Sequence, residues 1–114
     1  MIDMTVVLKD EYGNPMKDIF TRDGEDLSSC KELTLGDACA HALHSVSPEE
    51  REVTWEQKWS WSTLAERVRK DSKASLNAAE IRLITRRLGK LYGGLILMQA
   101  IPLLDPNAKP PLVE

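Results

Sequence analysis

Leu76-Asn77-Ala78-Ala79-Glu80-Ile81 is the stretch of the sequence that decides the fold. Asn77 can cap the N-terminus of a helix, and Glu80 can return a hydrogen bond to the amide of the cap residue, which together make a capping box. Leu76 and Ile81 stand where a hydrophobic staple places its two apolar side chains. The stretch therefore predicts a helix that begins directly after Asn77.

The residues after this start signal repeat at helical spacing. The apolar ones form a single stripe that would face a core: Ile81, Ile84, Leu88 and Leu91. The basic ones fall off that stripe: Arg82, Arg86, Arg87 and Lys90. Tyr92-Gly93-Gly94 can end the helix, so we expect it to cover residues 78–91.

Three further helices are predicted: one over 35–46, one from Ser47-Pro48 to about Lys70, and one over 95–104. The first begins after Thr34, which has the form of a capping box with Asp37. The second has a proline at its first position, where an amide proton would have no partner within the helix. The third is apolar all round, which predicts that it is buried.

The residues before these helices predict a β-hairpin. Met4–Leu8 is apolar and β-branched, as strands are, and Gly13-Asn14-Pro15 suits a turn. Met16–Phe20 would be the return strand. Because an isolated hairpin is only marginally stable, we expect this one to pack on the helices. Residues 21–32 are predicted to form a polar loop.

Together these signals predict a mainly α fold, in which an N-terminal β-hairpin is followed by about four helices around one core. The length of 114 residues suits one domain, and 42% hydrophobic with 29% charged residues is typical of a globular protein. We expect a single helical domain over residues 1–104. Residues 105–114 contain three prolines and are predicted to be an extended or disordered tail.

The sequence also gives an expectation for the cellular compartment in which the protein is located. Met1-Ile2-Asp3-Met4 lacks the basic leader of a signal peptide. The longest apolar run, Leu95–Leu104, has about half of the ~20 residues that a membrane-spanning helix needs. Cys30 and Cys39 do not make a disulfide framework. We therefore expect a cytoplasmic protein without a membrane partner.

The sequence offers few candidate catalytic or metal-binding residues. Cys39, His41 and His44, with Cys30 nearby, form the one metal-capable cluster of the sequence. His41 and His44 share a helical face, but Cys39 points elsewhere and no closely paired cysteines anchor the group. The sequence has no strained nucleophile turn, phosphate loop or dinucleotide fingerprint. We expect no enzymatic activity, no metal and no cofactor.

Trp55, Trp59 and Trp61 lie within seven residues and are the candidate partner-binding residues. Tryptophan is enriched at interface hot spots. On a helix the three rings cannot all face one core, so at least one should be partly exposed, and Trp61 lies off the stripe of Trp55 and Trp59. The alternative interpretation is that Trp55 and Trp59 belong to the core while Trp61 covers a neighbouring loop.

A second interpretation concerns nucleic acid. Residues 67–90 carry 8 basic and 2 acidic side chains, and the 78–91 helix would present Arg82, Arg86, Arg87 and Lys90. Recognition helices carry arginines to phosphates and base edges. However, the 71–76 connection is longer than a helix-turn-helix turn, and the chain is acidic, with a net charge of −3. These two facts favour a solvated helix face.

Three stretches carry a resemblance: Leu33-Thr34-Leu35-Gly36-Asp37-Ala38-Cys39, Leu76–Ile81, and Gly89-Lys90-Leu91-Tyr92-Gly93 leading into Gln99-Ala100. Through them residues 33–104 resemble a type of small protein encoded by tailed bacteriophages and prophages. The tryptophans and the 21–32 loop depart from that pattern. The resemblance implies a phage-encoded protein of the host bacterial cytoplasm and implies no site residues.

These observations favour a non-enzymatic protein–protein interaction module, phage-encoded, that serves as an assembly factor or modulates a host protein. Its partner would be another protein or a second copy of the chain. The alternative is a small nucleic-acid-binding protein that uses the basic helix 78–91.

Overall fold

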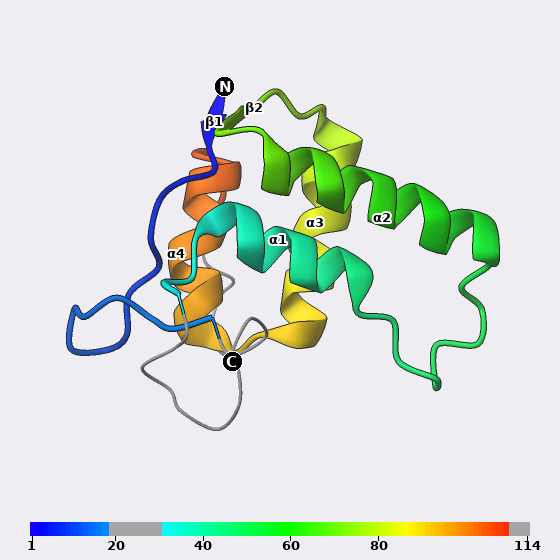
Figure 1. Ribbon diagram of the computed structural model, residues 1–114, viewed down its shortest axis with the longest axis horizontal. Coiled ribbons are helices and arrows are strands. Elements are labelled where there is room, and N and C mark those ends of the chain that lie inside the picture. The colour runs from blue at the N-terminus through cyan, green and yellow to red at the C-terminus, as the bar shows by residue number, and fades with distance from the viewer. Residues whose placement is uncertain (19–30, 110–114) are drawn as a thin grey trace.

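The computed structural model describes residues 1–18 and 31–109, and it confirms the mainly α fold (Figure 1). Within these two ranges four helices follow one another: α1 (Leu35–His44), α2 (Trp55–Lys70), α3 (Ala78–Leu91) and α4 (Gly94–Leu104). Two short strands, β1 (Ile2–Asp3) and β2 (Lys73–Ala74), form an antiparallel pair in which Ile2 lies opposite Ala74.

The core of the molecule is built around α1. This helix packs against both α2 and α3, while α4 packs against α3 and β1. Its small residues allow close approach, and a Cβ at Gly36 would lie 2.8 Å from the carbonyl oxygen of Val68 in α2. Eight of the ten α1 residues are buried as a result: Leu35, Gly36, Asp37, Ala38, Cys39, Ala40, Ala42 and Leu43.

The predicted hairpin is present as a short antiparallel bridge between Lys9 and Pro15. Its turn is closed by the amide of Asp10, which donates to the Asn14 carbonyl at 2.8 Å, and Gly13 takes the positive φ of 83° that glycine permits. A further antiparallel bridge joins Lys17 to Glu32. Residues 19–30, which include the end of the predicted return strand and most of the predicted polar loop, lie outside the described residues.

The capping signals decide two helix starts correctly. Asn77 accepts from the Glu80 amide at 2.8 Å and Glu80 accepts from the Asn77 amide at 3.0 Å, so α3 begins with the predicted capping box. In α1 the Thr34 hydroxyl accepts from the Asp37 amide at 3.2 Å. The carboxylate of Asp37 does not return to the cap amide; it accepts from the Thr34 hydroxyl instead, at 3.1 Å.

The predicted start of the second helix at Ser47-Pro48 is wrong. The helix α2 begins at Trp55, where the hydroxyl of Thr54 accepts from the Gln57 amide and the Gln57 side chain accepts from the Thr54 amide. Residues 47–53 form turns instead, closed by bonds such as that from the Glu50 amide to the Ser47 carbonyl at 3.0 Å. The physical reason is tertiary, because the Glu50 carboxylate pairs with the buried Arg87 of α3, as described below.

The prediction that the last helix is buried all round is also wrong. Only one stripe of α4 is buried, formed by Ile96, Ala100 and Leu104. Met98 is 74% exposed because α4 lies on the outside of the bundle, where a helix covers the core with one face only. The chain after α4 begins with a turn that the Ala108 amide closes on the Asp105 carbonyl, and residues 110–114 lie outside the described part of the chain.

Candidate functional site

The first turns of α2 carry two exposed tryptophans. Trp55 and Trp59 are one helical turn apart, and their rings stack with centroids 6.0 Å apart and an angle of 23° between the planes. Each side chain is 68% exposed. This is unusual, since tryptophan side chains are large and on average mostly buried.

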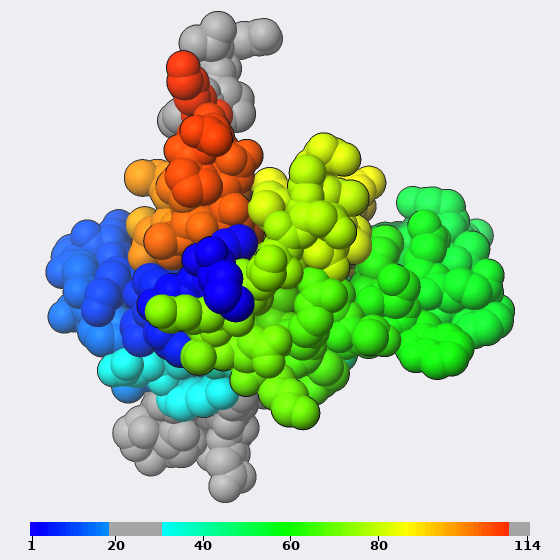
Figure 2. All heavy atoms as spheres, turned by 90° about the horizontal axis from the view of Figure 1, so that it is seen from above, coloured from blue at the N-terminus to red at the C-terminus, as the bar shows by residue number. Residues whose placement is uncertain are grey.

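A groove runs beside these rings, between α2 and α3. Its volume is about 870 Å³, and its lining is formed by α2, α3 and the cap residue of α3: Trp55, Glu56, Trp59, Ser60, Thr63, Leu64, Arg67, Asn77, Ala79, Glu80 and Leu83. Figure 2 shows the notch between the start of α3 and the first turns of α2, which stand out from the body. At the inner end of the groove Arg67 pairs with Glu80 at 2.6 Å.

Trp61 points toward the core, unlike Trp55 and Trp59. It is half-buried and packs against the core, and the guanidinium carbon of Arg87 lies 4.9 Å from the centre of its ring. This distance is typical of a cation–π contact. The expectation that at least one ring is exposed is confirmed, but the structure reverses which rings: Trp55 and Trp59 are outside and Trp61 is inside.

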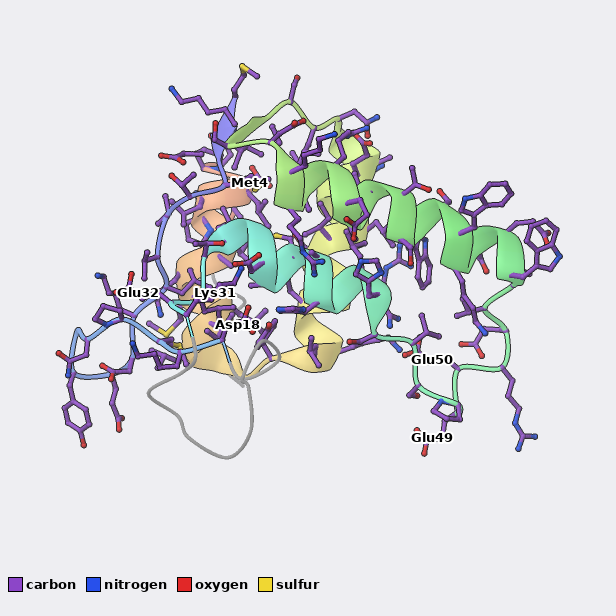
Figure 3. All side chains as sticks on the ribbon, viewed as in Figure 1. Met4, Asp18, Lys31, Glu32, Glu49 and Glu50 are labelled. Carbon is purple, nitrogen blue, oxygen red and sulfur yellow. The ribbon has the colours of Figure 1, made fainter. Side chains whose placement is uncertain are left out.

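Arg87 is a structural residue of the buried interior. Only 3% of it is exposed. Its guanidinium bonds both carboxylate oxygens of Glu50, at 2.5 and 3.1 Å, and also donates to the carbonyls of Ala42 and Ser45. These bonds fix the connection between α1 and α2, on which Glu50 lies (Figure 3). The hydrogen bond from Arg87 lowers the pKa of Glu50 below its ordinary value.

The basic face predicted for α3 is therefore smaller than the sequence suggested. Arg82, Arg86 and Lys90 are exposed, at spacings of four residues that place them on one side of the helix. Arg87 does not join them, because a guanidinium enclosed by Glu50 and two carbonyls cannot reach a nucleic acid. Three of the four predicted nucleic-acid-binding residues remain on the surface.

The residues of the metal-capable cluster are held separately. Cys39 is fully buried in α1, and burial raises the pKa of its thiol to about 12. His41 lies 2.9 Å from the Asp18 carboxylate, and His44 faces α2. Cys30 lies outside the described residues. Within the described ranges 1–18 and 31–109, no three histidine, cysteine or acidic side chains converge as metal ligands would.

The surroundings of Asp18 could not be anticipated from the sequence. Asp18 is buried before the gap in the described chain, beside Lys31 on the far side of that gap (Figure 3). The hydroxyl of Tyr92 is buried and has no hydrogen-bond partner among the described residues. Burial raises the pKa of this phenol well above its ordinary value, and the Asp18 charge adds to the effect. Asp18 thus lies between His41 of α1 and the C-cap residue Tyr92 of α3.

A second arrangement that the sequence did not indicate joins α1 and α2. Nδ1 of His44 lies 2.9 Å from the Ser62 hydroxyl, and Nε2 lies 3.0 Å from the Glu66 carboxylate. These are the residue types of a serine–histidine–acid triad. Ser62 lies in the interior of α2, however, where backbone amides donate within the helix and cannot bind an oxyanion. The arrangement connects the end of α1 to α2 and explains why His44 lies where it does.

Comparison of the chain with protein-family models, with curated proteins and with solved structures found no match. The candidate site is therefore defined by its own geometry: an open groove whose outer rim is formed by two stacked, exposed tryptophans.

Proposed function

We propose that the protein is a non-enzymatic protein–protein interaction module and that the groove between α2 and α3 binds its partner. The observation that carries this proposal is the exposure of Trp55 and Trp59 at the rim of the groove, 68% each. Two exposed indole rings leave apolar area in water, and burying apolar area contributes ~25 cal/mol per Å². Tryptophans at such positions are the residues that most often dominate an interface.

The proposed setting is a bacterial cell infected by a tailed phage. The resemblance of residues 33–104 to small phage and prophage proteins supports a role in the host cytoplasm, as an assembly factor or as a modulator of a host protein.

No helix among the described residues is long and apolar enough to cross a membrane.

Affinity capture from bacterial cells tests the proposal. Wild-type protein, the double variant Trp55→Ser/Trp59→Ser and the control Lys58→Ala are used as baits, because Lys58 is exposed on α2 but does not line the groove. A partner identified with the wild type should bind the control equally and the double variant at least ~30-fold more weakly, as expected when a hot spot worth ~2 kcal/mol is removed. A partner that binds all three alike would contradict the proposal, provided that circular dichroism shows the same fold for each.

The second candidate function is nucleic-acid binding, and the exposed row Arg82, Arg86 and Lys90 favours it. Here the charge-reversed variant Arg82→Glu/Arg86→Glu separates the two functions. Binding of DNA or RNA at physiological salt by the wild type, lost in this variant and falling steeply as salt rises, would replace the interaction module as the function.

A further inference from the structure

The groove has a definite charge order along its length. Glu56 lies at its outer end, in the first turn of α2, and Arg67 lies at its inner end, eleven residues later. At a rise of 1.5 Å per residue the two are ~16 Å apart along the helix. The α2 side chains that line the groove between them are uncharged: Trp59, Ser60, Thr63 and Leu64.

The charged end residues can still bind a ligand. Glu56 is exposed at the mouth of the groove. Arg67 gives one short bond to Glu80, yet 46% of its side chain is exposed. Since a guanidinium has five N–H donors, Arg67 can bind a second carboxylate beside Glu80.

One segment of the same chain has the complementary order. Lys109-Pro110-Pro111-Leu112-Val113-Glu114 places a cation and an anion at its ends, with four apolar residues between them. Paired prolines favour the polyproline II conformation, which rises 3.1 Å per residue. In that conformation Lys109 and Glu114 are ~16 Å apart, the same separation as Glu56 and Arg67.

We propose that residues 109–114 of a second copy of the chain bind along the groove, with Lys109 beside Glu56 and Glu114 beside Arg67. The proline rings then pack against the indole of Trp59, as in the aromatic-lined grooves that bind polyproline segments. This inference rests on the groove being the binding surface proposed above, and it names the occupant.

The occupant comes from a second copy because of where the elements lie. In Figure 1 α4 lies on the left of the molecule, whereas the first turns of α2 lie at its right edge. Lys109 follows the end of α4 by only five residues, so residues 109–114 would have to cross the bundle to reach Glu56 of their own molecule. A second copy supplies the segment without any rearrangement of the helices.

Sedimentation of the full chain over a range of concentrations tests this inference. The wild type should self-associate, and the charge reversals Glu56→Lys and Lys109→Glu should each weaken association about tenfold, since each removes an attraction and adds a repulsion. An equimolar mixture of the two variants should recover wild-type association, because the reversed groove of one fits the reversed segment of the other. Lys58→Glu, an exposed change on α2 outside the groove, is the matched control and should have no effect.

Trp59→Ala provides a variant that does not depend on charge and should weaken association ~30-fold. A wild type that stays monomeric up to about 1 mM would overturn the inference. Its binding free energy would then be weaker than ~4 kcal/mol, too weak for a groove and a segment with matching charges and apolar surfaces. Association that neither reversal changes would also overturn it. If the chain is monomeric while the tryptophan variant still loses a captured partner, the inference fails and the proposed function stands.

Discussion

The two halves of α2 differ in what surrounds them. From the middle of the helix onward, Trp61, Leu64, Ala65 and Val68 follow the spacing i, i+3, i+4, i+7 and pack into the core. In the first half, Trp55 and Trp59 lie on another side of the helix and remain exposed. One helix thus contributes a core stripe at one end and an open apolar surface at the other. The difference shows that large apolar residues in one helix need not serve one purpose.

The largest expected difference between the halves is in stability. Leu64→Ala should lower the free energy of unfolding by ~2–5 kcal/mol, because it empties a packed site in the core. Trp59→Ala removes a larger side chain but should change the free energy by less than ~0.5 kcal/mol, as surface substitutions do. Urea denaturation measures both. A loss from Trp59→Ala equal to that from Leu64→Ala would mean that the first half of α2 is also part of the core.

A smaller difference is expected between two helix caps. Thr54 and Asn77 both begin complete capping boxes. Asn77→Ala should cost ~1 kcal/mol of global stability, because the first turn of α3 continues into the core stripe. Thr54→Ala should cost less in urea denaturation, since the first turns of α2 can fray while Leu64 stays buried. In Thr54→Ala we expect faster hydrogen exchange at amides 57–60 without an equal loss in the free energy of global unfolding. This result would show that the first turns of α2 unfold separately from the core.

The smallest expected effect is the loss of stability at acidic pH that comes from Glu50, in the connection between α1 and α2. The hydrogen bond from Arg87 holds the pKa of Glu50 below its ordinary value of 4.5. Because the folded-state pKa is lowered, the ionised carboxylate stabilises the fold above pH 4.5, and this contribution is lost as the pH falls through the folded-state pKa. The melting temperature of the wild type should therefore fall more steeply below pH 4.5 than that of Glu50→Gln. Parallel pH profiles for the two proteins would contradict this assignment.

A helix start can be predicted from the sequence where only one capping signal is present nearby. The capping box of Asn77 and Glu80 predicts the first residue of α3 correctly, and Thr34 does the same for α1. For α2 two start signals compete, at Ser47-Pro48 and at Thr54. Their choice depends on the bond between Glu50 and Arg87, which are 37 residues apart. Local reasoning has no access to such a pairing.

The sequence predicts a binding surface at the tryptophan segment, and this stays a prediction. The stripe through Trp55 and Trp59 leaves Trp61 outside. The stripe of Leu64, Ala65 and Val68 reaches Trp61 by the same helical spacing, so the burial of Trp61 can be predicted from the sequence. The burial of Arg87 has no local signal, because Arg86 and Arg87 are adjacent in the sequence. Only the contacts of Arg87 with distant residues, Glu50 above all, bury one side chain and leave the other exposed.

The pairing of β1 with β2 has a consequence for how the chain is made. Ile2 lies opposite Ala74, so the first strand has no partner until more than seventy residues have been synthesised. Closing so long a loop carries an entropy cost that grows with the logarithm of its length, and contacts far apart in sequence form slowly. During translation β1 is therefore among the last of the described segments to pair. A protein fused ahead of Ile2 would be carried beside the connection between α2 and α3, next to the inner end of the helix that bears the tryptophans.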